Sequence, residues 1–209
     1  MEEQIIKNVF SQQHALEQKL NDGSASKETM RSWLTQRYQF EIAMVKKDLI
    51  VLSKCPDQQF RQQWIKRVMD ADSTDGGLDS WVRLGLAAGV DVKDESLVLP
   101  NVRFALDAFL AWCSSTNWKV VVSGSLSQLQ ATVNHRKKYN TWPTLYPWIE
   151  PGGLEYFITR SLQADFDSKT CLEFIKTCSL DEEQLKESAN IKRNVMKCLL
   201  DSVLLETVK

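Results

Sequence analysis

Hydrophobic residues recur at spacings of three and four along most of the chain, which is the pattern of amphipathic helices. Ile5, Val9, Leu16 and Leu20 predict a first helix that ends near Gly23. In the second predicted helix, Ser26 is the cap and Pro56 the terminator. Its predicted apolar stripe is formed by Leu34, Tyr38, Ile42, Val45, Leu49 and Leu52.

The helical pattern continues to the end of the chain. Asp57 is predicted to cap a helix that buries Phe60, Trp64 and Val68, and another helix is predicted over 78–89. A helix is predicted from Pro100 through Phe104, Ala108 and Trp112, and another from about Trp118 to about Tyr139. Further helices are predicted after 151–153 and after a capping box over Ser179–Glu182. Two prolines in 142–148 predict a non-helical segment. We therefore expect one all-α domain over 1–209, a bundle of about seven or eight helices.

Charge and composition exclude several partners. Lys and Arg number 26 against 27 Asp and Glu, so the chain has no general attraction for nucleic acid or an anionic membrane. We interpret Arg136-Lys137-Lys138 as a solvated helix face. The acidic start lacks a signal-peptide pattern, no apolar stretch is long enough to span a membrane, and five cysteines form no CxxC pair. We expect a cytoplasmic protein with reduced thiols and no nucleic-acid or membrane partner.

Only two histidines, His14 and His135, are present, and neither lies in a Glu-x-x-His motif. Histidine-rich zinc and di-iron sites need more ligands than this. The chain also lacks a P-loop, a dinucleotide-binding GxGxxG and a GxSxG motif. We therefore expect neither a metal nor an organic cofactor.

One group of residues suggests oxygen chemistry. Tyr156 and Arg160 are four apart on a predicted helix and so share a face, and His135 lies on the preceding predicted helix, before the aromatic–proline segment. Arginine can stabilise an anionic oxygen species, while histidine and tyrosine can donate hydrogen bonds or protons. From the spacing alone, a surface Tyr–Arg pair is the commoner explanation.

From about residue 14 to residue 165, and more weakly in the last helix, the chain resembles the pyrroloquinoline quinone synthases of the TenA/PqqC family. The resemblance implies the haem-oxygenase-like helical fold. It rests on landmarks in matching order: Gln36-Arg37-Tyr38, Val45-Lys46-Lys47-Asp48, Lys54-Cys55-Pro56-Asp57 with Phe60-Arg61 and Trp64, Gly76 to Trp81, Leu99 to Phe104, Trp142-Pro143, Tyr146 to Ile149, and Tyr156-Phe157 with Arg160.

The resemblance also implies an activity and a site. The family enzymes close a ring and oxidise an amino-acid-derived substrate by eight electrons with O₂ and no cofactor. Their oxygen-binding residues correspond to His135, Tyr156 and Arg160. An arginine and a lysine of the family pocket correspond to Arg67 and Lys192. Because family members are commonly homodimers, we expect a homodimer here.

Several pocket residues depart from the family pattern. Ala71 stands where the family has an active-site histidine, and Gln128 replaces a glutamate. The remaining departures are Phe40 and Glu41 for a Tyr-Gln pair, Phe109 for a tyrosine, and His14 with Ser11 for a two-histidine segment. We therefore expect a pocket that is more apolar and poorer in bases.

Three hypotheses follow. The first is a cofactor-independent oxidase that uses O₂ on a small ligand, amino-acid-derived or quinol-like, and does not make pyrroloquinoline quinone. The second is a catalytically degenerate protein that binds a ligand or another protein. The third is a metal-dependent oxygenase or a TenA-type hydrolase with a cysteine nucleophile.

Overall fold

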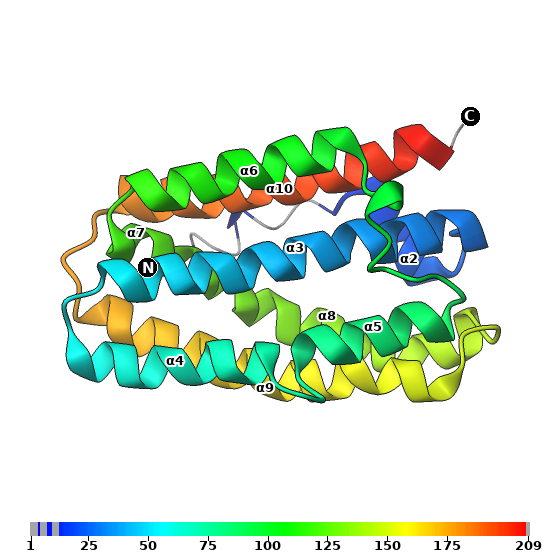
Figure 1. Ribbon diagram of the computed structural model, residues 1–209, viewed down its shortest axis with the longest axis horizontal. Helices are drawn as coiled ribbons and strands as arrows, with labels where there is room; N and C mark the ends of the chain where they lie inside the picture. Colours follow the sequence, from blue (N-terminus) through cyan, green and yellow to red (C-terminus); the bar gives the residue numbers. More distant parts are fainter. Residues whose placement is uncertain (1–3, 5–7, 10–12, 208–209) are drawn as a thin grey trace.

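The computed structural model describes residues 4, 8–9 and 13–207, and in this part of the chain it contains helices and no strand (Figure 1). The α-helices are α2 (Ala15–Asp22), α3 (Lys27–Lys54), α4 (Gln58–Asp72), α5 (Gly77–Ala87), α6 (Pro100–Ser115), α7 (Trp118–Ser123), α8 (Gln128–Leu145), α9 (Pro151–Lys176) and α10 (Glu182–Thr207). Two short 3₁₀ helices are η1 (Glu95–Leu97) and η2 (Gly124–Ser127). The all-α prediction is confirmed, while Ile5 and Ser11 lie outside the described residues.

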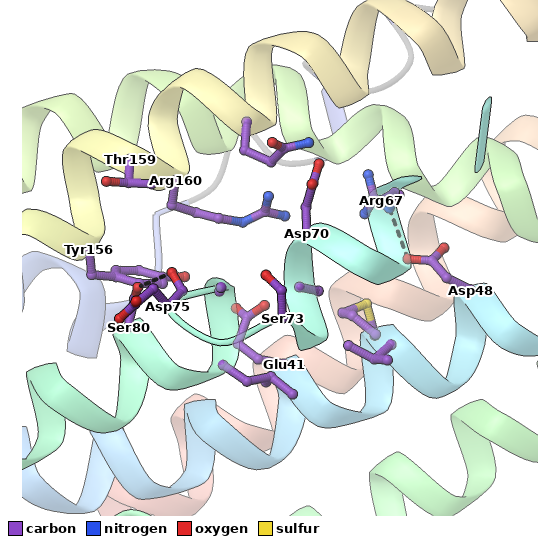
Figure 2. Close-up of a pocket in the computed structure, with 17 residues that line it drawn as sticks. Glu41, Asp48, Arg67, Asp70, Ser73, Asp75, Ser80, Tyr156, Thr159 and Arg160 are labelled. Atoms are coloured by element: carbon purple, nitrogen blue, oxygen red, sulfur yellow. Dashed lines mark hydrogen bonds and ion pairs between the residues drawn. The ribbon is translucent and has the colours of Figure 1, made fainter. Parts of the chain in front are cut away.

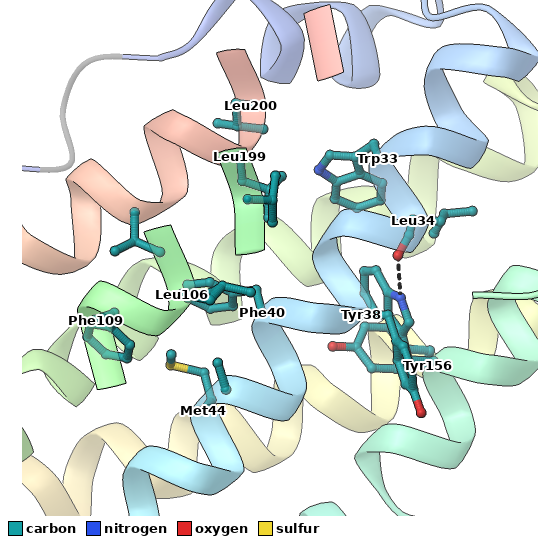
Figure 3. Packing of buried hydrophobic residues seen from close by; sticks show 14 of the residues in the cluster. Trp33, Leu34, Tyr38, Phe40, Met44, Leu106, Phe109, Tyr156, Leu199 and Leu200 are labelled. Atoms are coloured by element: carbon teal, nitrogen blue, oxygen red, sulfur yellow. Dashed lines mark hydrogen bonds between the residues drawn. The ribbon is translucent and has the colours of Figure 1, made fainter. Parts of the chain in front are cut away.

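Helix α3 is the centre of the bundle, because it contacts α4, α5, α6, α7 and α10. Figure 1 shows α6 and α10 side by side along one flank of α3, with α4, α5, α8 and α9 along the opposite flank. On the α6 and α10 side, Phe40 of α3 packs among Leu106, Phe109 and Leu199 (Figure 3). On the other side, the Trp81 indole N–H donates to the Leu34 carbonyl at 2.9 Å.

The predicted helix ends at the start of the chain are confirmed by hydrogen bonds and backbone angles. Ser26 Oγ accepts the N–H of Thr29 at 3.1 Å, and Asp57 Oδ1 accepts the N–H of Phe60 at 3.0 Å. Gly23 ends α2 with a φ of 84°, which is the left-handed conformation that glycine adopts without strain.

Two apolar residues of the helical pattern, Phe104 and Leu49, lie outside the core. Phe104 is 75% exposed, because α6 turns Val102, Leu106, Phe109 and Cys113 inward. In α3, Leu49 is 50% exposed while the neighbouring Lys47 and Asp48 are buried. A helix surrounded on several sides buries more than one stripe, and α3 buries polar side chains that find charged partners on other helices.

The aromatic–proline segment was predicted to be non-helical, yet α8 continues through Pro143 to Leu145. Tertiary bonds stabilise this last turn: the Trp142 indole N–H donates to the Leu20 carbonyl at 3.1 Å, and the Tyr146 hydroxyl donates to the Lys19 carbonyl at 3.0 Å. The predicted helix from Trp118 to Tyr139 is instead divided into α7, η2 and the first part of α8.

The start of the last helix also differs from the prediction. The reciprocal capping bonds join Asp181 and Gln184: the Gln184 N–H donates to Asp181 Oδ1 at 2.8 Å, and the Asp181 N–H donates to Gln184 Oε1 at 3.1 Å. The cap therefore lies two residues beyond the predicted Ser179–Glu182 box.

Candidate functional site

Two cavities lie next to each other in the bundle, with volumes of about 250 Å³ and about 150 Å³. The first is lined mainly by α3, α4, α9 and the turn before α5, and the second mainly by α3, α8 and α10. Both are lined by Glu41, Met44 and Arg160, so these three side chains form a common wall. Figure 2 shows Arg160 and Tyr156 of α9 facing Glu41 of α3 and Asp70 of α4 across the first cavity.

A buried ion-pair network runs along one side of the first cavity. Asp48 Oδ2 accepts from Arg67 Nε at 2.8 Å, and Asp48 Oδ1 lies 2.6 Å from Lys47 Nζ. The same Oδ1 accepts from the Trp64 indole at 2.9 Å. The two cations hold the pKa of Asp48 down at about 2 despite burial, which acts in the opposite direction. Asp48 is therefore a buried, ionised carboxylate.

Asp167 extends the network to the common wall. Its Oδ2 lies 2.7 Å from Arg67 Nη1, an ion pair without hydrogen-bond alignment, and 3.4 Å from Arg160 Nη1. Its Oδ1 accepts from Gln163 Nε2 at 2.9 Å. Arg67 is thus an ion-pair partner of two carboxylates, Asp48 and Asp167, while it also lines the first cavity.

The three residues expected to bind oxygen come together at the common wall. The rings of His135 and Tyr156 are edge to face with centroids 5.8 Å apart. His135 lines the second cavity, Tyr156 lines the first, and Arg160 lines both. The trio is therefore distributed across two chambers.

Burial keeps both rings of this trio uncharged. It lowers the pKa of His135 well below 6.5, and the positive charges of Arg37 and Arg160 act in the same direction. Burial also raises the pKa of the Tyr156 hydroxyl. His135 Nδ1 is buried and has no hydrogen-bond partner among the described residues. A neutral imidazole with an unsatisfied nitrogen can accept a hydrogen bond or a proton.

Basic side chains dominate the second cavity. Arg37, Lys138 and Lys192 line it together with Arg160, and Glu41 is bound to Arg37 at 2.7 Å. Burial is the main cause that lowers the pKa of Lys192 to about 7 and that of Lys138 to about 8. Lys138 was interpreted as part of a solvated face, so this cavity residue was missed. The run of three basic residues gave no indication of which one turns inward.

The other predicted site residues fall in different places. Phe40 and Gln128 line the second cavity, and Ala71 lines the first. Phe109 belongs to the core and stacks on Trp112, with ring centroids 6.2 Å apart, outside both cavities.

His14 lies outside the two cavities as well. It caps α2, and its Nε2 lies 2.8 Å from Asp201 Oδ1. It lines an outer hollow of about 590 Å³. The hollow and the second cavity share the lining residues Glu17, Gln130, Asn134, Lys138, Met196 and Leu200. The second cavity therefore adjoins a larger, more external space.

Asp48 and Asp167 were also missed by the sequence analysis. Asp48 lies in a segment that carries the family resemblance, but its role depends on Arg67 from another helix. Asp167 follows a long amphipathic run and carries no motif. Only the fold, which brings α3, α4 and α9 together, reveals these two carboxylates.

The structure also bears on the metal and thiol hypotheses. In the described part of the chain, no three His, Cys, Asp or Glu side chains are grouped as metal ligands. None of the five cysteines lines either cavity, and burial raises the pKa of Cys113 to about 11 and that of Cys171 to about 12. No helix in the described ranges has the length and hydrophobicity needed to cross a membrane.

Comparisons with known proteins agree with this fold. Two relatives named pyrroloquinoline-quinone synthase come from Pseudomonas syringae pv. syringae (strain B728a) and Pseudomonas putida (strain W619). The first is 34% identical over 199 residues, covering 91% of this chain and 79% of the relative. The second is 35% identical over 191 residues, covering 87% and 76%.

Solved structures show the same fold at low sequence identity. A domain of unknown function with a haem oxygenase-like fold from Shewanella denitrificans OS217 has a TM-score of 0.79 at 14% identity, covering 98% of this chain and 89% of that one. A TenA homologue from Pseudomonas syringae pv. tomato DC3000 has a TM-score of 0.75 at 15% identity, covering 97% and 88%. The sequence model of the TENA/THI-4/PQQC family matches residues 2–199. With this match and relatives about one-third identical over most of their length, the chain belongs to the TENA/THI-4/PQQC family.

Proposed function

We propose that the protein is a cofactor-independent oxidase that uses O₂ on a small substrate, amino-acid-derived or quinol-like, and that it does not make pyrroloquinoline quinone. The main support is the meeting of His135, Tyr156 and Arg160 at the wall between two cavities. The proposal includes a cytoplasmic location, as the sequence pattern and cysteine usage suggest, and a homodimer, as expected from the family.

The chemistry needs a base, a positive charge and a site with little water. An electron-rich substrate reduces O₂ once it has been deprotonated, and the first products are anionic oxygen species. His135 is neutral and has an unsatisfied nitrogen, so it can take the proton. Arg160 can stabilise the reduced oxygen, and Tyr156 can donate a hydrogen bond to it. In a buried site these electrostatic effects are stronger than in water.

A substrate with fewer carboxylates fits the cavity residues. Arg67, which would otherwise receive a substrate carboxylate, is neutralised by Asp48 and Asp167. Ala71 and Gln128 offer no base where the family has histidine and glutamate. The loss of one positioned base lowers a rate by a factor of about 10²–10⁴.

The test is O₂ uptake and H₂O₂ release with a panel of hydroquinones and catechol amino acids. We expect His135→Ala and Arg160→Ala each to reduce the rate by about 10²-fold or more. Lys169→Ala is the matched control on α9, since Lys169 is exposed and its ion pair in the described structure is with the exposed Asp165. Equal rates for all three variants would refute the proposal. Ligand binding without any O₂ uptake would instead favour the alternative, a degenerate binding protein.

A further inference from the structure

Lys192 is a buried lysine without an acidic partner. Its side chain belongs to α10, is 8% exposed and lines the second cavity. Its Nζ has one hydrogen-bond contact in the described structure, a long one of 3.4 Å to the Gly124 carbonyl, and it forms no ion pair there within 4.0 Å. Buried lysines normally require such a partner, because a desolvated ammonium is costly.

Lys47 shows the contrast within the same core. It is 3% exposed, yet its Nζ lies 2.6 Å from Asp48 Oδ1 and donates to Ser125 Oγ at 2.8 Å. Lys47 is therefore part of a structural ion-pair network. The two lysines are comparably buried, and they differ in whether a carboxylate compensates the charge.

The surroundings of Lys192 favour its neutral amine. Positive charges of Lys47, Arg67 and Arg37 oppose protonation, and the Glu41 carboxylate, which favours it, is itself bound to Arg37 at 2.7 Å. Together with burial, these charges bring the pKa to about 7, so about half of the molecules carry a free amine near neutral pH. A neutral amine in a desolvated pocket is a nucleophile.

The cavity around this amine fits a single ring. Its volume of about 150 Å³ matches the size of an engineered cavity that takes up benzene. Trp33, Phe40 and Leu200 provide apolar wall, while Lys138 and Arg37 can attract an anionic substituent. The adjoining outer hollow provides space for the rest of a larger ligand.

We propose that Lys192 is a nucleophilic lysine that forms a Schiff base with a ring-sized, anionic aldehyde, ketone or quinone. The Nζ lone pair attacks the carbonyl carbon, and the C=O π electrons move to oxygen, which becomes a carbinolamine hydroxyl. That oxygen then leaves as water with the two hydrogens of the amine, and a C=N bond remains. The step needs no oxidant and does not depend on the proposed oxidase activity.

The test is reductive trapping of the imine on the full chain. The probe is 4-carboxybenzaldehyde with cyanoborohydride, and the labelled lysines are mapped by peptide mass spectrometry. At about pH 7 the neutral fraction of Lys192 exceeds that of an ordinary lysine by roughly a thousandfold, so we expect it to be labelled at least about tenfold faster than the exposed Lys169. Its labelling should reach half its maximum rate near pH 7.

Controls lie within the same protein. Lys47 should remain unlabelled, and Lys192→Met should lose the rapid label while its circular dichroism is unchanged. If that variant does not fold, the wild-type map alone decides. Labelling of Lys192 no faster than Lys169, or rapid labelling of Lys47 or Lys138 in its place, would overturn the proposal. Loss of oxidase activity in other variants would leave this result unaffected.

Discussion

The buried carboxylate of Asp48 gives the sharpest prediction about stability. In Asp48→Asn the side chain keeps its size and can still accept from the Trp64 indole, but Lys47 loses its counter-ion and Arg67 keeps only that of Asp167. Removing one partner of a buried ion pair costs about 3–5 kcal/mol of unfolding free energy, because an uncompensated charge remains. The pKa of Asp48 gives an independent figure: a fall from 3.8 to about 2 corresponds to about 2 kcal/mol.

The sign of the pH effect follows from this depressed pKa. The carboxylate contributes its stability above the unfolded pKa, and that contribution is lost as the pH falls from about 5 toward 2. The difference in unfolding free energy between wild type and Asp48→Asn should therefore become smaller as the pH falls through this range. Because the two proteins share all other carboxylates, the contributions of those groups cancel when one unfolding free energy is subtracted from the other at each pH.

The assay is urea unfolding followed by circular dichroism at several pH values. Asp165→Asn is the matched control, because Asp165 pairs with Lys169 at 2.8 Å on the surface, where such pairs contribute about 0–1 kcal/mol. We expect Asp48→Asn to lose at least about 2 kcal/mol near neutral pH. An effect as small as that of the control, or a difference that does not change with pH, would refute the reasoning.

Two further predictions concern packing and protonation. Gly153→Ala would bring a Cβ within 2.4 Å of the Ala87 Cβ between α9 and α5, so we expect about 1–3 kcal/mol of destabilisation in thermal unfolding. In the control Gly152→Ala, the new Cβ would meet nothing within 4 Å, so thermal stability should be unchanged or higher. Equal losses of stability in the two variants would contradict the close packing at Gly153. For His135, NMR should show a neutral ring at about pH 6, with signals assigned through a His14→Gln variant. A His135 midpoint near 6.5 would refute its burial-lowered pKa.

Local structure was the part of the fold that could be predicted from the sequence. Ser26, Asp57 and Gly23 act through bonds or backbone angles within a few residues, and their roles as helix boundaries are confirmed. Pro143 failed as a helix breaker because Trp142 and Tyr146 are bound to carbonyls of α2, more than a hundred residues earlier in the chain. Long-range bonds of this kind leave no local signal.

The candidate site could likewise be predicted from local spacing and resemblance only in part. The resemblance identified Tyr156 and Arg160, whose spacing of four residues puts them on one helix face, and both line the first cavity. It also identified Arg67 as a cavity residue but could not show that Asp48 and Asp167 neutralise it. The ionic partners come from three helices, so their effect on the charge available to a ligand depends on the assembled bundle.

The residues that line the first cavity differ in how strongly folding constrains them. Asp48 and Arg67 line it and also hold the bundle together through Trp64, so a change there alters folding and ligand selection at once. Ala71 and Leu78 also line this cavity, but they take no part in that ion-pair network. We therefore expect substitutions of Ala71 and Leu78 to reshape the cavity at a smaller cost in folding free energy than substitutions of Asp48 or Arg67.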